Sequence, residues 1–388
     1  MNMKNKLTSY KFFIIQILLW ITWGSFGQYY IYYLTDNGYT NSTIGIALTV
    51  FSIFGIIGQY SSGYIADKKR TIKNIYILFN ILFIMFVGLF IVFVKIPPAS
   101  ILIIGFIGFI WLSLEPLLDS WFFSYKDIDK SDYCFVRCGG SLGYSLIALC
   151  LGPIITYWGY NFMFISFFLF ALLNIFMSSK LNDGTFLKNN VEKIDLKKLF
   201  SIPAYVQLLV FSVFIFTTTT MINSYYPMII RNVGGNTTHL GLTIAISTIL
   251  EIPLFLCSSR FILKFKANVI FLICSILLIL RVITLSLATS PIGVLGTVIF
   301  HASAFTLSFS TIKIYISKIT PKDMQASAQT VAASFIFGIT GILSSLIGGF
   351  VLDISMSAFY IALNILSFLT FIYSIFYILI GSKNCNLL

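Results

Sequence analysis

The sequence predicts an all-α polytopic membrane protein with twelve transmembrane helices in two pseudo-symmetric six-helix bundles. Composition is the first indication, because 58% of the 388 residues are hydrophobic and only 10% are charged. Soluble domains carry about 25% charged residues. The second indication is a series of long apolar runs separated by short polar breaks, and the third is a weak similarity between the two halves of the chain.

Twelve apolar stretches reach the length of roughly 20 residues that a spanning helix needs. The breaks between them, such as TDNGYTN and DKKRTIK, carry turn or charge signals. In chain order, the predicted spans are 11–34, 42–66, 74–95, 99–124, 136–158, 161–179, 203–229, 239–259, 268–288, 293–313, 327–352 and 357–381.

The longest polar break divides the chain into an N-terminal bundle at 1–180, a cytoplasmic linker at 181–199 and a C-terminal bundle at 200–388. STIGIALTVFSIFG in the first half resembles THLGLTIAISTILE in the second, and each stretch leads into a basic loop. Parallel halves of six spans are typical of secondary transporters that bind solute near the bilayer midplane.

Charge sets the expected orientation. With a cytoplasmic N-terminus, 21 of the 25 Lys and Arg residues fall on the cytoplasmic side and two on the outer side. We therefore expect an integral protein of the bacterial inner (plasma) membrane with both termini cytoplasmic. Because the basic residues lie in short clusters between spans, the net charge of +12 does not indicate nucleic-acid binding. The six cysteines show neither a metal-ligand pattern nor a disulfide framework.

Few ionisable residues fall inside the predicted spans, and each is costly there, at about 2.5–3.5 kcal/mol on insertion scales. Such groups usually face a water-filled cavity and find a partner. The candidates are Glu115 and Asp119 in span four, Arg137 at the start of span five, Glu251 in span eight, Arg281 in span nine and His301 in span ten.

In the first half, Arg137 follows Asp119 by 18 residues across a short loop, so we expect the two side chains to face each other. Glycines directly after Arg137 allow helices to approach closely. Tyr144 lies two turns further along the same face. An acid, a cation and an aromatic ring suit a sugar, although a structural ion pair and an ordinary interface aromatic remain alternatives. Glu115 precedes Pro116 and has no predicted partner.

In the second half, Glu251, Arg281 and His301 lie on three consecutive spans. An acid, a cation and an imidazole together could form a proton relay or a charge-balanced site. The alternative is a histidine that merely hydrogen-bonds to a neighbouring helix.

At these residues the chain resembles the major facilitator superfamily. GYIADKKRTIK at 63–73 is similar to the superfamily's G-x-x-x-D-[RK]-x-G-[RK] loop, with Arg70 where a glycine is usual. The resemblance implies that this loop gates the cytoplasmic side and that Gly63 and Asp67 help to switch conformation.

Within the superfamily the chain resembles the oligosaccharide:proton symporters typified by lactose permease. The match rests on the spacing from Asp119 to Arg137 to Tyr144, and on the second-half residues. It implies sugar-hydroxyl contacts for the first two and ring stacking for Tyr144. For the second half it implies that Glu251 binds substrate and couples to His301, with Arg281 at the family's 20-residue spacing before His301.

Two positions depart from that family. Ala304 stands where the family has its proton-carrying Glu, and Leu254 where it has a sugar-contacting Asn. If protons are coupled, Glu251, His301 or the acids of span four must carry them. Glu115 is therefore a candidate for the missing role.

Together these features predict a secondary active transporter that moves a small polar solute, a sugar or oligosaccharide, by alternating access with proton symport. Spans one, four, five, seven, eight and ten are expected to line the cavity, with Asn223 and Tyr226 at an outer gate. The aromatic first span, WITWGSFGQYYIYYL, would equally suit a nucleoside or a drug-like compound. No catalytic or metal-binding pattern indicates an enzyme. We expect a monomer without cofactor or bound metal, driven by the proton gradient.

Overall fold

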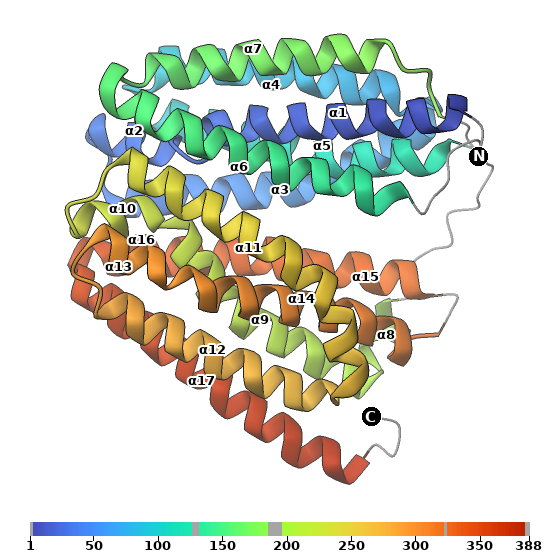
Figure 1. The fold of residues 1–388 in the computed structure, drawn as a ribbon, viewed down its shortest axis with the longest axis vertical. Coiled ribbons are helices and arrows are strands. Elements are labelled where there is room, and N and C mark those ends of the chain that lie inside the picture. The colour runs from blue at the N-terminus through green and yellow to red at the C-terminus, as the bar shows by residue number, and fades with distance from the viewer. Residues whose placement is uncertain (1–2, 126–131, 185–195, 322–323, 385–388) are drawn as a thin grey trace. The chain divides into compact units, whose positions relative to one another are not determined.

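The computed structural model describes residues 3–125, 132–184, 196–321 and 324–384. Every regular element in these ranges is a helix (Figure 1). The chain forms two compact units: the first comprises residues 1–189 and 236–245, and the second comprises residues 190–235 and 246–388. Most of the linker expected from the sequence, residues 185–195, lies outside the described residues.

Seven helices precede the linker and belong to the first unit, which also takes the start of α11. They are α1 (Met3–Phe26), α2 (Tyr30–Asp36), α3 (Asn41–Lys69), α4 (Lys73–Phe93), α5 (Pro97–Ser124), α6 (Tyr133–Trp158) and α7 (Asn161–Ser179).

The second unit begins with the short helix α8 and contains one π-helical stretch, η3, between two α-helical segments. Its helices are α8 (Leu196–Phe200), α9 (Pro203–Ser224), α10 (Tyr226–Asn232), α11 (Thr237–Lys264, from residue 246), α12 (Ala267–Ser286), α13 (Pro291–Gly296), α14 (Val298–Ile319), α15 (Gln325–Ala333), η3 (Ser334–Ile339), α16 (Thr340–Ile354) and α17 (Met356–Asn384).

Helix pairing repeats from one unit to the other. In the first unit α1 packs against α6 and α7, while α4 packs against α5 and α7. In the second unit α9 packs against α16 and α17, and α12 packs against α14 and α17. These are the same pairings in span order, so each unit is built on the same six-helix plan, as the sequence predicts.

The tightest helix contact in the first unit joins α3 to α5 through reciprocal glycines. A Cβ at Gly58 would lie 2.1 Å from the Phe109 carbonyl oxygen, and one at Gly108 would lie 2.2 Å from that of Phe51. Only glycine allows backbones to approach this closely.

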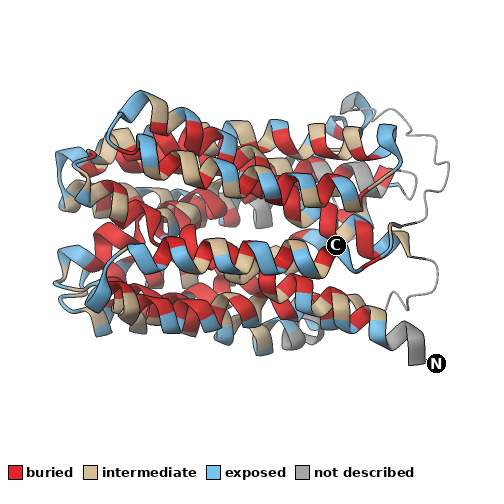
Figure 2. Ribbon diagram, turned by 90° about the horizontal axis from the view of Figure 1, so that it is seen from above, coloured by how far each residue is buried: buried red, intermediate tan, exposed pale blue. Residues whose placement is uncertain are grey.

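In the described residues, twelve helical stretches are long and apolar enough to cross a membrane, which confirms the number predicted from the sequence. Exposed residues recur along the helices between their ends (Figure 2). Many are apolar, for example Ile165, Leu169 and Leu172 on one face of α7. An apolar face of this kind suits lipid and not water. The span ends differ from prediction by a few residues, as at Pro97–Ser124 and Phe135–Trp158.

Candidate functional site

Arg137 in α6 forms an ion pair with Glu115 of α5. Both side chains are partly accessible, Arg137 by 41% and Glu115 by 24%. The expectation that left Glu115 without a partner is therefore wrong. Glu115 lies one helical turn before Asp119, and spacing along the sequence could not decide which acid meets the guanidinium.

Asp119 accepts a hydrogen bond of 2.9 Å from the Tyr133 hydroxyl, at the start of α6. The carboxylate also acts electrostatically on the Arg137 guanidinium. Asp119 thus lies in the same polar region as Arg137 and its ion-pair partner Glu115.

Arg137 and Trp20 both donate to the side chain of Gln16 in α1. The distances are 2.8 Å from Arg137 Nη1 and 3.2 Å from Trp20 Nε1 to the Gln16 amide oxygen. The guanidinium also lies over the Trp20 ring, 5.6 Å from its centroid. Arg137 therefore has a charged partner on α5, and a neutral partner and an aromatic partner on α1.

The Trp20 ring beneath this guanidinium belongs to a group of aromatic rings. Trp20 makes edge contacts with Tyr144 and Trp111, at centroid distances of 5.4 and 5.5 Å. Trp111 in turn stacks on Trp23, at 4.3 Å and an interplanar angle of 6°. Tyr144 and Arg137 thus both contact the Trp20 ring, and these rings form an aromatic wall from α1, α5 and α6. We call Gln16, Trp20, Glu115, Arg137 and Tyr144 the Arg137 cluster.

The glycines after Arg137 allow α6 to approach α1. A Cβ at Gly143 would lie 2.5 Å from the Ile17 carbonyl oxygen, and one at Gly139 2.8 Å from that of Phe13. Close approach was expected from the sequence, and the structure identifies α1 as the partner helix. This contact brings Gln16 and Trp20 next to Arg137.

In the second unit, Glu251 of α11 faces His301 of α14. The Glu251 Oε1 and His301 Nε2 atoms are 3.7 Å apart, which is longer than a hydrogen bond. Ser247, one turn before Glu251, hydrogen-bonds to its carboxylate. The histidine is nearly buried, with 6% of its side chain accessible, whereas Glu251 retains 20%.

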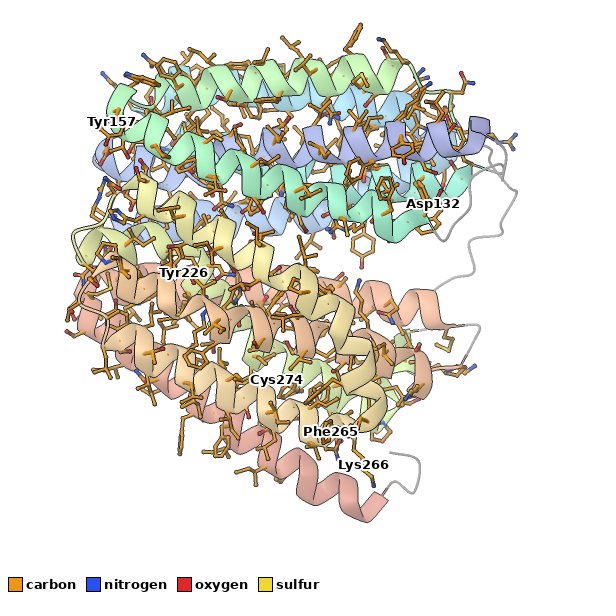
Figure 3. All side chains as sticks on the ribbon, in the orientation of Figure 1. Asp132, Tyr157, Tyr226, Phe265, Lys266 and Cys274 are labelled. Atoms are coloured by element: carbon orange, nitrogen blue, oxygen red, sulfur yellow. The ribbon has the colours of Figure 1, made fainter. Side chains whose placement is uncertain are left out.

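Arg281 of α12 is completely buried. Its Nη2 donates to Asn223 Oδ1 at 3.0 Å and to the Tyr226 hydroxyl at 2.9 Å. Tyr226, labelled in Figure 3, begins α10 in the second unit. The two residues expected at an outer gate thus bind Arg281, which gives them a partner that the sequence did not predict.

Arg281 also acts electrostatically on both Glu251 and His301. Within the described part of the chain, its Nε and Nη1 atoms and the His301 Nδ1 atom have no hydrogen-bond partner. Buried polar atoms are rarely left in this state. We call Asn223, Tyr226, Glu251, Arg281 and His301 the Arg281 cluster. It combines an acid, a cation, an imidazole and spare hydrogen-bonding capacity.

The loop between α3 and α4 shows why the superfamily pattern usually has a glycine where this chain has Arg70. Asp67 and Arg70 are exposed, and Arg70 ends α3 in the left-handed conformation with φ of 51°. Its N–H bonds back to the Ala66 and Asp67 carbonyls, as in a helix end that normally uses glycine. A Cβ at Gly63 would meet no atom within 4 Å. The preference for glycine in the superfamily pattern thus falls on the position that needs a positive φ.

The next helix, α4, is capped from a distant segment of the same unit. The Asp183 carboxylate accepts from the backbone N–H groups of Ile72 and Lys73, each at 3.1 Å. The neighbouring Asn182 carbonyl accepts from Trp121 Nε1 at 3.1 Å and from the Tyr125 hydroxyl. Burial, with the Asp183 carboxylate nearby, raises the pKa of Tyr125 to about 12, so this hydroxyl remains a donor.

Some residues that the sequence analysis missed contact the charged groups of both units. Gln16 and Tyr133 bind the charged groups of the first unit, and Ser247 binds Glu251 in the second. A lone amide in the apolar run KFFIIQILLW was a signal for Gln16, because polar side chains within spans usually have partners.

In the described ranges, no group of three or more His, Cys, Asp or Glu residues could hold a metal ion. The cysteines with described side chains, Cys138, Cys150 and Cys274, are free thiols.

Comparison with known proteins identifies the family. The chain belongs to the MFS_1 like family, whose model matches residues 7–362. It is 23% identical over 342 residues to the uncharacterized transporter YwbF of Bacillus subtilis (strain 168), covering 86% of this chain and 84% of that protein. It is 22% identical over 243 residues to the maltose permease of Geobacillus stearothermophilus, covering 62% and 61%.

Solved structures share the fold. The nucleoside transporter NupG superposes with a TM-score of 0.83 at 15% identity, covering 96% of this chain and 98% of that chain. A D-xylose-proton symporter superposes with a TM-score of 0.74 at 16% identity, covering 95% and 97%. The chain is thus an MFS-type secondary transporter and an integral membrane protein. Similarity at this level of identity defines the fold and leaves the narrower lactose permease-like assignment a proposal.

Proposed function

We propose that this member of the MFS_1 like family transports a sugar or oligosaccharide by alternating access, together with a proton. The observation that carries the proposal is the Arg281 cluster. A buried cation with spare donors, near an acid and an imidazole, is costly inside a membrane span and is retained where a solute or proton is bound. Hydroxyl groups of a sugar supply the acceptors that Arg281 and His301 lack.

The Arg137 cluster supports the same class of solute. Arg137, Glu115 and Asp119 offer donors and acceptors for hydroxyl groups, while Tyr144 and Trp20 offer ring surfaces for the apolar face of a pyranose. Glu251 is the first candidate for the proton carrier, because it lies beside His301 and is not directly paired with a guanidinium in the described residues. Glu115 remains the second candidate.

A nucleoside or drug-like solute is the alternative, and the stacked indoles of Trp23 and Trp111 favour it. Flat bases stack on indole and on other aromatic rings. The same wall could therefore accept a base in place of a sugar ring.

Counterflow in proteoliposomes tests the proposal with radiolabelled maltose, xylose and uridine. We expect a sugar to exchange, and solute addition to lightly buffered cells to make the medium alkaline. Exchange of uridine without exchange of either sugar would replace the sugar by the nucleoside. Exchange without any change in pH would remove proton symport.

A further inference from the structure

Gln16 is a buried amide in an otherwise apolar spanning helix. Only 1% of its surface is accessible, and it lies one turn before Trp20 on α1. A buried amide is unfavourable by about 1–3 kcal/mol unless it is hydrogen-bonded. Its position is therefore informative about the groups that it binds.

The two groups that face one atom of the Gln16 amide are both obligate donors. The guanidinium of Arg137 and the indole N–H of Trp20 have no acceptor capacity, so that atom is the amide oxygen. One oxygen thus holds the cation and the ring together. This arrangement fixes Arg137 over Trp20, at 5.6 Å from the ring centroid.

The backbone of α6 leaves room for this arrangement. A Cβ at Gly140 would lie 2.7 Å from Trp20 Cδ1 and 3.3 Å from the Gln16 amide. Distances below 3.0 Å require the indole to move. The absence of a side chain at Gly140 therefore leaves the space that Trp20 and Gln16 occupy.

Arg137 thus has oxygen partners on two different helices, the charged Glu115 on α5 and the neutral Gln16 on α1. A solute hydroxyl or a proton competes for the carboxylate of Glu115, whereas the amide of Gln16 does not titrate. With Glu115 alone, the guanidinium would lose its position whenever the carboxylate was engaged.

We propose that Gln16 is a positioning residue, which keeps Arg137 and Trp20 in their binding arrangement independently of the state of Glu115. This inference rests on the proposed function, because Arg137 and Trp20 matter as solute contacts. It gives α1 a role in specificity, which the residue spacing in spans four and five did not predict.

The test compares Gln16→Met, which keeps the size of the side chain and removes the acceptor, with the double variant Gln16→Glu/Glu115→Gln, which moves the acid from α5 to α1. Counterflow is measured with radiolabelled maltose, xylose and uridine in turn. Loss of a hydrogen bond to a charged group should raise the KM of Gln16→Met roughly tenfold, with little change in maximal rate. The double variant should have a KM at least about threefold below that of Gln16→Met, since Arg137 regains a partner on each helix.

A second measurement does not depend on transport. The fluorescence of Trp20, obtained by subtracting the spectrum of Trp20→Phe, should shift in Gln16→Met and in Gly140→Ala, and should return in the double variant. If none of the three solutes exchanges, the proposed function fails while this spectrum still decides the role of Gln16. A Trp20 spectrum unchanged in Gln16→Met, or a lower protein yield with unchanged KM, would overturn the proposal.

Discussion

The two units carry charged clusters that differ in how completely they are paired. In the Arg137 cluster the cation is partly accessible and has an acid, an amide and an indole as partners. In the Arg281 cluster the cation is fully buried, its hydrogen-bond partners Asn223 and Tyr226 are neutral, and two of its nitrogen atoms have no partner in the described residues.

Under the proposed function, this difference predicts that each cluster contributes in its own way to transport. A paired, accessible cation beside aromatic rings changes little in energy when a solute arrives, and it contributes shape and orientation. A buried cation with spare donors gains most from an acceptor, because an unmade hydrogen bond in a low-dielectric site is costly. We therefore expect the second unit to dominate affinity and coupling.

The largest effect is expected at Arg281. Under the proposed function, Arg281→Met should lower counterflow by roughly 100-fold or more, because it removes two proposed charge-assisted hydrogen bonds to the solute, each worth about 1.5–3 kcal/mol. Arg281→Lys is the matched control, and it should recover only part of the rate because lysine lacks the planar fork. If counterflow of Arg281→Met stays within threefold of wild type at equal protein in the membrane, the Arg281 cluster does not dominate affinity.

The next largest effect is expected at Glu251, where a substitution should remove proton coupling and leave solute exchange in place. Glu251→Gln should abolish solute-dependent alkalinisation, because the amide takes up no proton, while counterflow at equal pH continues at a similar rate. Glu115→Gln should retain alkalinisation. The reverse pattern, measured with a pH electrode in lightly buffered cells, would assign the proton to the first unit.

A smaller change is expected when the first cation is altered. Arg137→Lys should raise KM about tenfold, because an ammonium group cannot keep Glu115, Gln16 and the Trp20 face at once. The maximal rate should hold, since the spare donors of the second unit are untouched. If Arg137→Lys lowers counterflow as much as Arg281→Met does, the two clusters contribute equally to transport.

The smallest expected effect tests stability without touching either cluster. Arg70→Gly should stabilise the protein by roughly 0.4–1 kcal/mol, because glycine adopts the positive φ without strain. Unfolding in mixed micelles measures the change, with Arg70→Ala as the control that keeps the Cβ. Unaltered counterflow would show that stability gained in the first unit does not alter solute binding.

The spans were predictable because bilayer thickness fixes the length of an apolar run, and the charges inside them were conspicuous because each is costly there. Which acid meets Arg137 was not predictable. Glu115 and Asp119 lie on one face of the same helix, and the choice between them depends on how α5 and α6 pack.

The uncharged residues of the Arg137 cluster were harder to predict from the sequence. Gln16 carries no charge, and Trp20 lies in an aromatic-rich span where nothing marks one ring above another. Their roles follow from α6 lying against α1 through glycine, which is a contact between distant segments. The π-helical stretch Ser334–Ile339 likewise had no distinctive pattern in the sequence.

The reciprocal glycine contact between α3 and α5 has a consequence for how substitutions combine. Gly58 and Gly108 each lie close to the backbone of the opposite helix. A methyl group at either position would therefore move the same two helices apart. Once that separation has occurred, the second methyl group meets space that is already open. Gly58→Ala and Gly108→Ala should therefore be strongly sub-additive in a double-mutant cycle, with a coupling of about 0.5–3 kcal/mol, because both act on one distance.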